Sequence, residues 1–200
     1  VDYWIKNRNE KTYLFNPSNI NQKPKIIYDR NYQDRYSDPG SFITERNAYN
    51  KSVLKIESNN LILMGDGYSE KGQFPFVDRL NLENLKSKRI YESNYTDKLE
   101  NLIDFDVNKN QLLVRIESKN DYPNYYFKNL NGKKVNRITD FMNPFEQLSK
   151  VDKQVITYKR NDGVELSGVL YLPVGYDKTS KEKMPMIMWA YPREFKDKSS

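Results

Sequence analysis

The chain of 200 residues contains no cysteine and no histidine. Without cysteine, disulfide bonds, thiolate metal sites and a cysteine nucleophile are excluded, and the redox compartment stays open. Without histidine, the chain lacks the usual general base of a hydrolase and the commonest zinc ligand. A Ser-His-Asp triad would therefore need its base from another segment or another chain.

Long apolar runs are also missing, because none approaches the ~20 residues of a membrane-spanning helix, and the first residues hold no signal-peptide apolar region. We therefore expect no membrane span. The formal net charge is +6, but lysine and arginine are interleaved with 27 acidic residues. No stretch combines basic, aromatic and glycine residues as nucleic-acid modules do, so we expect no nucleic-acid partner. We also expect no metal and no cofactor.

Aromatic residues are plentiful: they make up 14% of the chain, with sixteen tyrosines and nine phenylalanines. This enrichment is typical of strand-rich structure. Short apolar bursts separated by polar, asparagine-rich turns predict antiparallel strands, and no long helical periodicity interrupts them. The predicted strands are Tyr3–Ile5, Thr12–Phe15, Ser52–Ile56, Leu61–Met64, Phe76–Leu82, Arg89–Tyr91, Leu102–Phe105, Gln111–Ile116, Tyr125–Leu130 and Val135–Ile138.

An internal repeat organises these strands. Shifting the sequence by about 48 residues, a period in the range of β-propeller blades, aligns Phe74-Pro75 with Tyr122-Pro123, Asn81-Leu82 with Asn129-Leu130, and Arg89-Ile90 with Arg137-Ile138. The repeat predicts that Leu61–Met64 and Leu112–Ile116 occupy equivalent strands in successive four-stranded blades. It also predicts that Val1–Phe15 is the outer hairpin of a preceding blade, with its turn at Asn7–Lys11. A β-sandwich with similar hairpins is the alternative.

The pattern changes at Asp140–Phe145, a proline-containing connector. After it, Gln154–Arg160 and Val164–Leu172 predict two strands joined by the tight turn Asn161-Asp162-Gly163. The run Met186–Tyr191 is short and almost wholly apolar, which predicts a strand buried on both faces of an α/β sheet. The expected fold class is therefore mainly β, with propeller blades followed by the first strands of an α/β sheet.

The segment Tyr158–Pro173, followed by Gly175-Tyr176-Asp177, closely resembles the start of the peptidase domain in the prolyl oligopeptidase family. Met188–Lys196 is similar to the glutamyl endopeptidase branch of that family. The resemblance extends upstream to Tyr36–Gly40, Gly65–Ser69, Phe76–Leu80 and Ile138–Phe141. It implies that residues 1–148 are the C-terminal part of a β-propeller and that residues 149–200 are the truncated start of an α/β-hydrolase domain.

The resemblance implies a serine peptidase that cleaves peptides after glutamate, with the propeller restricting access. Its family places a Gly-x-Ser-x-Gly elbow, an Asp and a His further along the chain. This chain contains neither a Gly-x-Ser-x-Gly elbow nor a histidine. The resemblance therefore implies that no catalytic residue lies in this chain and that the chain alone is inactive. The expected partners are the peptide substrate and the remainder of the parent chain. The alternatives are a related aminopeptidase or dipeptidyl peptidase, and a non-catalytic propeller that binds proteins.

Three residues in or just after the apolar run are candidate site residues. Acyl transfer needs donors aimed at the developing oxyanion, and Tyr191 and Trp189 are the candidate oxyanion-hole residues, with core or rim aromatics as the alternative. Arg193 follows the predicted strand end, where ligands gather in open α/β sheets. A guanidinium there would bind a substrate glutamate in a bidentate manner. The alternative is a surface arginine paired with Glu194.

Two loop motifs have simpler interpretations. Asp66–Gly72 is rich in oxygen ligands, but it lacks the remaining positions of a calcium loop, so we expect an inter-strand loop. Asp29–Tyr36 alternates charged and aromatic residues of mixed sign. That pattern predicts a connecting loop with internal ion pairs rather than a nucleic-acid surface.

Overall fold

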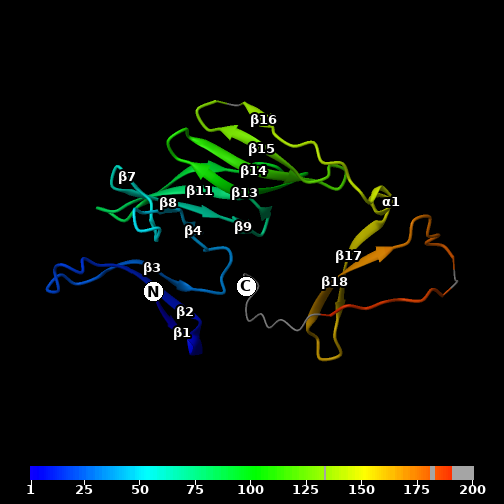
Figure 1. Cartoon of the computed structure of the whole chain (residues 1–200). Coiled ribbons are helices and arrows are strands. Elements are labelled where there is room, and N and C mark those ends of the chain that lie inside the picture. The colour runs from blue at the N-terminus through cyan, green and yellow to red at the C-terminus, as the bar shows by residue number, and fades with distance from the viewer. Residues whose placement is uncertain (133, 181–182, 191–200) are drawn as a thin grey trace. The chain divides into compact units, whose positions relative to one another are not determined.

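The structure, a computed structural model, describes residues 1–132, 134–180 and 183–190. These residues are mainly β, in several antiparallel sheets (Figure 1). The chain divides into two compact units, one formed by Val1–Asp140 and one that begins at Phe141. Within the described ranges, no helix has both the length and the hydropathy needed to span a bilayer.

The first sheet, sheet I, is antiparallel and consists of β1 (Asp2–Trp4), β2 (Asn9–Leu14) and β3 (Lys25–Asn31), in that order. The predicted hairpin over Val1–Phe15 is present, but the predicted turn at Asn7–Lys11 is wrong. The chain reverses through the short 3-10 helix η1 (Ile5–Asn7) and Arg8, whose φ is 59°. Asn9, Glu10 and Lys11 are already paired with β1. Strand β2 is also central rather than outermost, because it pairs with β3.

Two larger sheets follow in the same unit. Sheet II has the order β12-β11-β8-β4, with β7 also paired to β8, and sheet III has the order β13-β14-β15-β16. Sheet II contains β4 (Ser41–Phe42), β7 (Ile56–Glu57), β8 (Asn60–Gly65), β11 (Phe76–Asn81) and β12 (Ser87–Glu92). Sheet III contains β13 (Leu99–Asp106), β14 (Gln111–Glu117), β15 (Asn124–Asn129) and β16 (Val135–Arg137). Two short ribbons pair β5 (Thr44–Arg46) with β6 (Ser52–Leu54), and β9 (Tyr68–Ser69) with β10 (Gly72–Gln73).

Sheets II and III repeat one another in their contacts. Leu61–Met64 lies in β8 and Leu112–Ile116 in β14. Counted from the end of the sheet whose strand comes first in the chain, β4 or β13, each is the second strand of its sheet. The two segments therefore lie in separate sheets at equivalent positions. Asn59 and Asn110, just before the two strands, both adopt left-handed φ values of 62° and 51°. Their carbonyls accept equivalent backbone hydrogen bonds, from Leu82 at 3.0 Å and from Leu130 at 2.9 Å.

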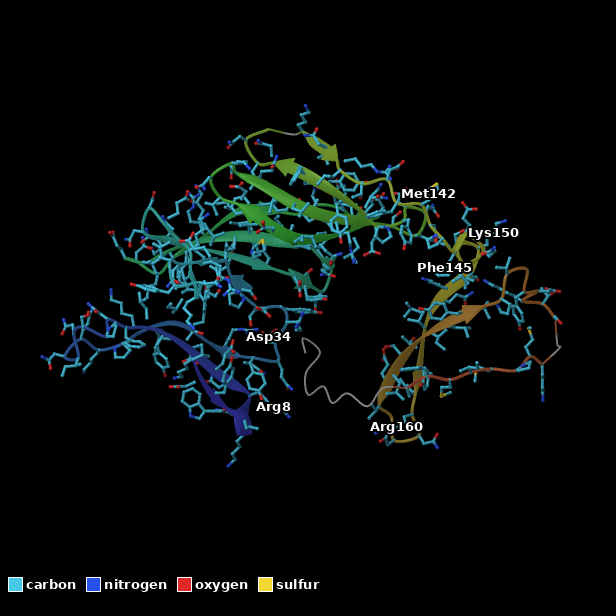
Figure 2. The ribbon with its side chains drawn as sticks, viewed as in Figure 1. Arg8, Asp34, Met142, Phe145, Lys150 and Arg160 are labelled. Atoms are coloured by element: carbon cyan, nitrogen blue, oxygen red, sulfur yellow. The ribbon has the colours of Figure 1, made fainter. Side chains whose placement is uncertain are left out.

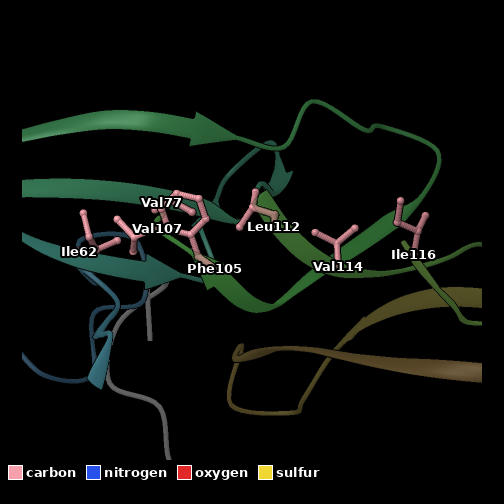
Figure 3. Packing of buried hydrophobic residues seen from close by; sticks show 7 residues of the cluster. All are labelled: Ile62, Val77, Phe105, Val107, Leu112, Val114 and Ile116. Carbon is pink, nitrogen blue, oxygen red and sulfur yellow. The ribbon is translucent and has the colours of Figure 1, made fainter. Parts of the chain in front are cut away.

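Alternate side chains of sheet II are buried in two separate clusters. The first joins sheets II and III and consists of Ile62, Val77, Phe105, Val107, Leu112, Val114 and Ile116 (Figure 3). The second consists of Leu61, Leu63 and Leu80, and it packs against Ile27 and Tyr28 of sheet I. Successive strand residues point to opposite faces, so Leu61, Ile62 and Leu63 cover both faces of one strand. Sheet II is thus the middle layer of this unit.

The second unit begins with a connector and a single-turn helix, α1 (Glu146–Ser149). Strands β17 (Asp152–Lys159) and β18 (Glu165–Leu172) then form an antiparallel hairpin, which confirms the two strands predicted there. The turn includes Gly163 at φ 88°, a conformation that favours glycine. The amide of Gly163 donates to the carbonyl of Arg160 at 2.8 Å and closes the turn.

The alternation of β14 predicts unequal effects for adjacent leucines. Leu112 is fully buried between sheets II and III, whereas Leu113 is only partly buried and projects from the opposite face. Leu112→Ala should lower the free energy of unfolding by about 2–5 kcal/mol. Leu113→Ala should lower it by about 1 kcal/mol or less. Urea titrations followed by tryptophan fluorescence test this order, and equal losses would contradict the assignment of the buried face.

Candidate functional site

The sequence places its three candidate site residues after the hairpin β17–β18. Trp189 lies in irregular structure, and its side chain is 87% exposed. Tyr191 and Arg193 lie outside the described residues. The structure therefore brings no oxyanion-hole or substrate-binding group together with Trp189 in the described part of the chain.

The predicted buried strand at Met186–Tyr191 is wrong for its described residues, Met186–Ala190. This segment has no strand pairing, and the side chain of Ile187 is 97% exposed. A strand buried on both faces needs hydrogen-bonded neighbours and covering layers. Among the described residues no strand pairs with this segment, so its apolar side chains stay in solvent.

The hairpin β17–β18 also exposes apolar side chains, on both of its faces. Val155 pairs with Val169 on one face, and both side chains are exposed. Ile156 and Tyr158 are exposed on the other face. An isolated two-stranded hairpin is at best marginally stable in water, so these faces are suited to contact with further structure.

An ion pair between Arg160, which is labelled in Figure 2, and Asp162 closes the tip of this hairpin. Arg160 Nε donates to Asp162 Oδ1 at 2.8 Å. This hydrogen bond lowers the pKa of the Asp162 carboxyl and raises the pKa of the Arg160 guanidinium. Both side chains are exposed, so the pair orders the turn and adds little to overall stability.

The two motifs meet within the first unit, although Asp29–Asn31 belongs to strand β3 and not to the predicted loop. Arg35 Nη2 lies 2.9 Å from Asp66 Oδ2, and its guanidinium lies 4.8 Å from the centre of the Tyr68 ring. The segment from Asp66 to Gly72 carries the β9–β10 ribbon, as expected of an inter-strand loop. In the described residues, no group of three or more Asp or Glu side chains could hold a metal ion. The Arg35–Asp66 pair is a contact between two loops.

A buried polar cluster lies where sheets II and III meet, and the sequence analysis missed it. Glu100 of β13 is fully buried at its side chain, and Lys128 of β15 is 12% exposed. The Lys128 ammonium lies 2.6 Å from Glu100 Oε1 and donates to the Tyr91 hydroxyl at 2.9 Å. The Tyr91 hydroxyl donates to Glu100 Oε2 at 2.6 Å.

Two pKa values in this cluster are raised. Burial, together with the hydrogen bond to Glu100, raises the pKa of Tyr91 to about 12. Burial alone would lower the pKa of Lys128, but its hydrogen bonds to Glu100 and Tyr91 outweigh that effect and raise it. Both groups therefore favour their protonated forms in the folded chain.

Strand alternation carried a signal for this cluster. Glu100 pairs with Ile116, and Lys128 pairs with Leu112, so both charges occupy the inward face of sheet III. Strands β13 and β15 flank β14, and a glutamate and a lysine at their inward positions predict a buried ion pair across β14, since unpaired buried charges are very costly. The prediction required knowing which strands were adjacent, and the sequence analysis did not assign that.

Comparison with curated proteins finds two related sequences. Both are named "Probable glutamyl endopeptidase, chloroplastic", one from Oryza sativa subsp. japonica at 34% identity and one from Arabidopsis thaliana at 33% identity. Each match covers 98% of this chain. Both of these relatives are thus named as peptidases. The chain spans 22% of the length of each of these relatives. No protein-family model matches the chain.

Comparison with solved structures finds distant likenesses. The AtxE2 isopeptidase with astexin3-dC4 bound has a TM-score of 0.36 at 15% identity, over 87% of this chain and 26% of that one. The apo AtxE2 isopeptidase has a TM-score of 0.35 at 16% identity, over 68% of this chain and 22% of that one. These scores are too low to support an inference about fold or function, so the sequence matches carry the comparison.

The raised pKa of Tyr91 predicts how stability depends on pH. A folded-state pKa above the unfolded value of 10.0 means that this contribution is intact below about pH 10 and is lost as pH rises toward 12. Lys128, whose pKa is raised above 10.5, acts in the same direction. The titratable groups that face Tyr91 are Glu100 and Lys128, and the ring of Tyr95 also contacts the Lys128 ammonium.

We therefore expect Tyr91→Phe to reduce stability at pH 8 and to flatten its decline between about pH 9 and 11. Urea unfolding midpoints measured at each pH give this slope. Tyr122→Phe is the control, because Tyr122 is exposed and its removal should leave the slope of the original chain unchanged. Parallel pH profiles for the original chain and Tyr91→Phe would contradict the prediction.

Proposed function

We propose that this chain is part of a serine peptidase of the prolyl oligopeptidase type that cleaves peptide bonds after glutamate. The observation that carries the proposal is 34% identity with a probable glutamyl endopeptidase across 98% of the chain. In this proposal residues 1–148 belong to a β-propeller, and residues 149–200 begin an α/β-hydrolase domain. The stacked, repeating sheets II and III support the propeller assignment.

The exposed apolar surfaces of the second unit support its assignment to the start of a larger sheet. Val155, Val169 and Ile187 are exposed in the described residues, and β-sheets of the hydrolase type are covered on both faces. In the proposed parent protein, further strands and helices would cover these side chains.

The chemistry of acyl transfer divides between this chain and the rest of the parent. Because the chain has no histidine, the general base and the elbow serine must come from other residues. Tyr191, or the backbone amides near Trp189, would donate to the oxyanion of the tetrahedral intermediate. Arg193 would bind the carboxylate of the substrate glutamate through two parallel hydrogen bonds.

A second candidate is a propeller module that binds proteins and has no catalytic role. The stacked, repeating sheets II and III are as compatible with this candidate as with the first. The two candidates differ in what the parent sequence contains. An elbow serine followed by Asp and His supports the peptidase, and their absence supports the binding module.

The isolated chain should have no peptidase activity. With a glutamyl peptide ester as substrate, hydrolysis in its presence should equal that in buffer, because no residue of the chain serves as the histidine base. The measurement is release of the alcohol or chromophore over several hours. Turnover that a serine-directed phosphonate abolishes would overturn the assignment of the chemistry to other segments.

In the full-length peptidase, Arg193→Ala should lower kcat/KM for a glutamyl substrate by roughly one to two orders of magnitude. A glutaminyl substrate should lose much less, because it has no carboxylate to leave unpaired. Arg193→Lys should recover part of the loss, since an ammonium does not reproduce the planar fork of arginine. Equal losses for the two substrates would remove Arg193 from substrate recognition.

A further inference from the structure

The buried polar cluster joins parts of the chain that belong to different sheets. Tyr91 lies on β12 of sheet II, whereas Glu100 and Lys128 lie on β13 and β15 of sheet III. Tyr95 comes from the connection between the two sheets. The cluster therefore spans the junction at which the chain passes from one repeat to the next.

The surroundings of the Lys128 ammonium are those of a cation-binding site. Its nitrogen lies 4.5 Å from the centre of the Tyr95 ring and 5.5 Å from that of Tyr91. The Glu100 carboxylate lies 2.6 Å away. The face of Tyr95, the Tyr91 hydroxyl and one carboxylate together form an arrangement suited to an ammonium group, and desolvation strengthens each of these interactions.

We propose that Glu100, Tyr91 and Tyr95 form a buried ammonium-binding site, that Lys128 occupies it as a tethered ligand, and that this occupancy holds sheet III on sheet II. The tether explains why a charge is tolerated at this depth. Glu100 uses both of its oxygens, one toward Lys128 and one toward Tyr91. Removing one partner of a buried ion pair strongly destabilises the folded protein, because the other charge stays buried and unpaired.

The equivalent position in the neighbouring repeat is apolar. A shift of about 48 residues aligns Lys128 with Leu80, which is fully buried beside Leu61 and Leu63 and packs against Tyr28 of sheet I. Sheets I and II therefore meet through an apolar cluster, whereas between sheets II and III the apolar side chains are joined by the Glu100–Lys128 pair of sheet III, which is hydrogen-bonded to Tyr91 of sheet II. A sheet docked in the wrong place would bury Lys128 against leucines, so the site also favours the correct order of the layers.

The direct test empties the site and refills it with a free ligand. Lys128→Ala removes the atoms of n-propylammonium, so that ion is the probe. We expect Lys128→Ala to raise the unfolding equilibrium constant by roughly 100- to 1000-fold. Propylammonium should then lower that constant by tenfold or more, in a saturable manner, whereas n-propanol at equal concentration should have little effect. Equal effects of the two additives would overturn the proposal.

A second comparison keeps the test decisive if Lys128→Ala does not fold. Lys128→Met and Glu100→Gln keep the side-chain volumes nearly unchanged. We expect each single variant to raise the unfolding constant at least tenfold, and the double variant to be more stable than the product of the single effects predicts. Simple multiplication of the two single effects would overturn the proposal.

The surface pair Lys98–Asp121 serves as the matched control. Its charged atoms lie 2.8 Å apart, but the Asp121 side chain is more than half exposed. Lys98→Met should change the unfolding constant by less than about fivefold, and propylammonium should not affect that variant. A response of Lys98→Met to propylammonium equal to that of Lys128→Ala would also contradict a specific site.

Discussion

The stacking of sheet II between two layers is the constraint on which the rest of the structure depends. Strand β8 buries Leu61 and Leu63 toward sheet I and Ile62 toward sheet III. Burying one such side chain stabilises the folded state by about 1.5–3 kcal/mol. When both faces of a strand are covered, the apolar side chains on each face contribute in this way. The register of β8 is therefore fixed, since a slip of one residue would exchange its two faces.

The repeat of sheets II and III extends this constraint to the turns. The left-handed residues Asn59 and Asn110 begin their strands in the same way, and the same backbone hydrogen bond ties each to the hairpin that follows. The described residues of the second unit form no comparable layer. Its hairpin has exposed apolar residues on both faces, which fits a segment that is completed by further structure in the proposed peptidase.

Strands made of short apolar runs were predictable from the sequence. Leu61–Met64 and Leu112–Ile116 read directly as strands, and both are strands. Strand β3 was missed because Lys25–Asn31 mixes apolar residues with charges that pair across to β2. Met186–Tyr191 was predicted as a buried strand on composition alone. Its described residues, Met186–Ala190, form no strand, because a buried strand requires paired neighbours that composition does not supply.

The candidate site was predictable only in part. The resemblance and the sequence relatives agree on glutamyl endopeptidases, yet Tyr191 and Arg193 lie outside the described residues and Trp189 is solvent-exposed. The Glu100–Lys128 pair was not predicted from the sequence because it depends on the order of the strands in sheet III, where β13 and β15 flank β14. Local patterns gave the faces of strands, whereas contacts between distant strands required the fold.

Native-state hydrogen exchange tests the central claim most directly. The claim is that sheets II and III unfold as one cooperative pair of layers and that the second unit unfolds independently of them. The account predicts that the slowest amides of β8 and β14 exchange with one common free energy that falls in parallel with added urea. Amides of β17 and β18 should exchange far faster. Different opening free energies for β8 and β14, or equal protection of β17, would contradict the account.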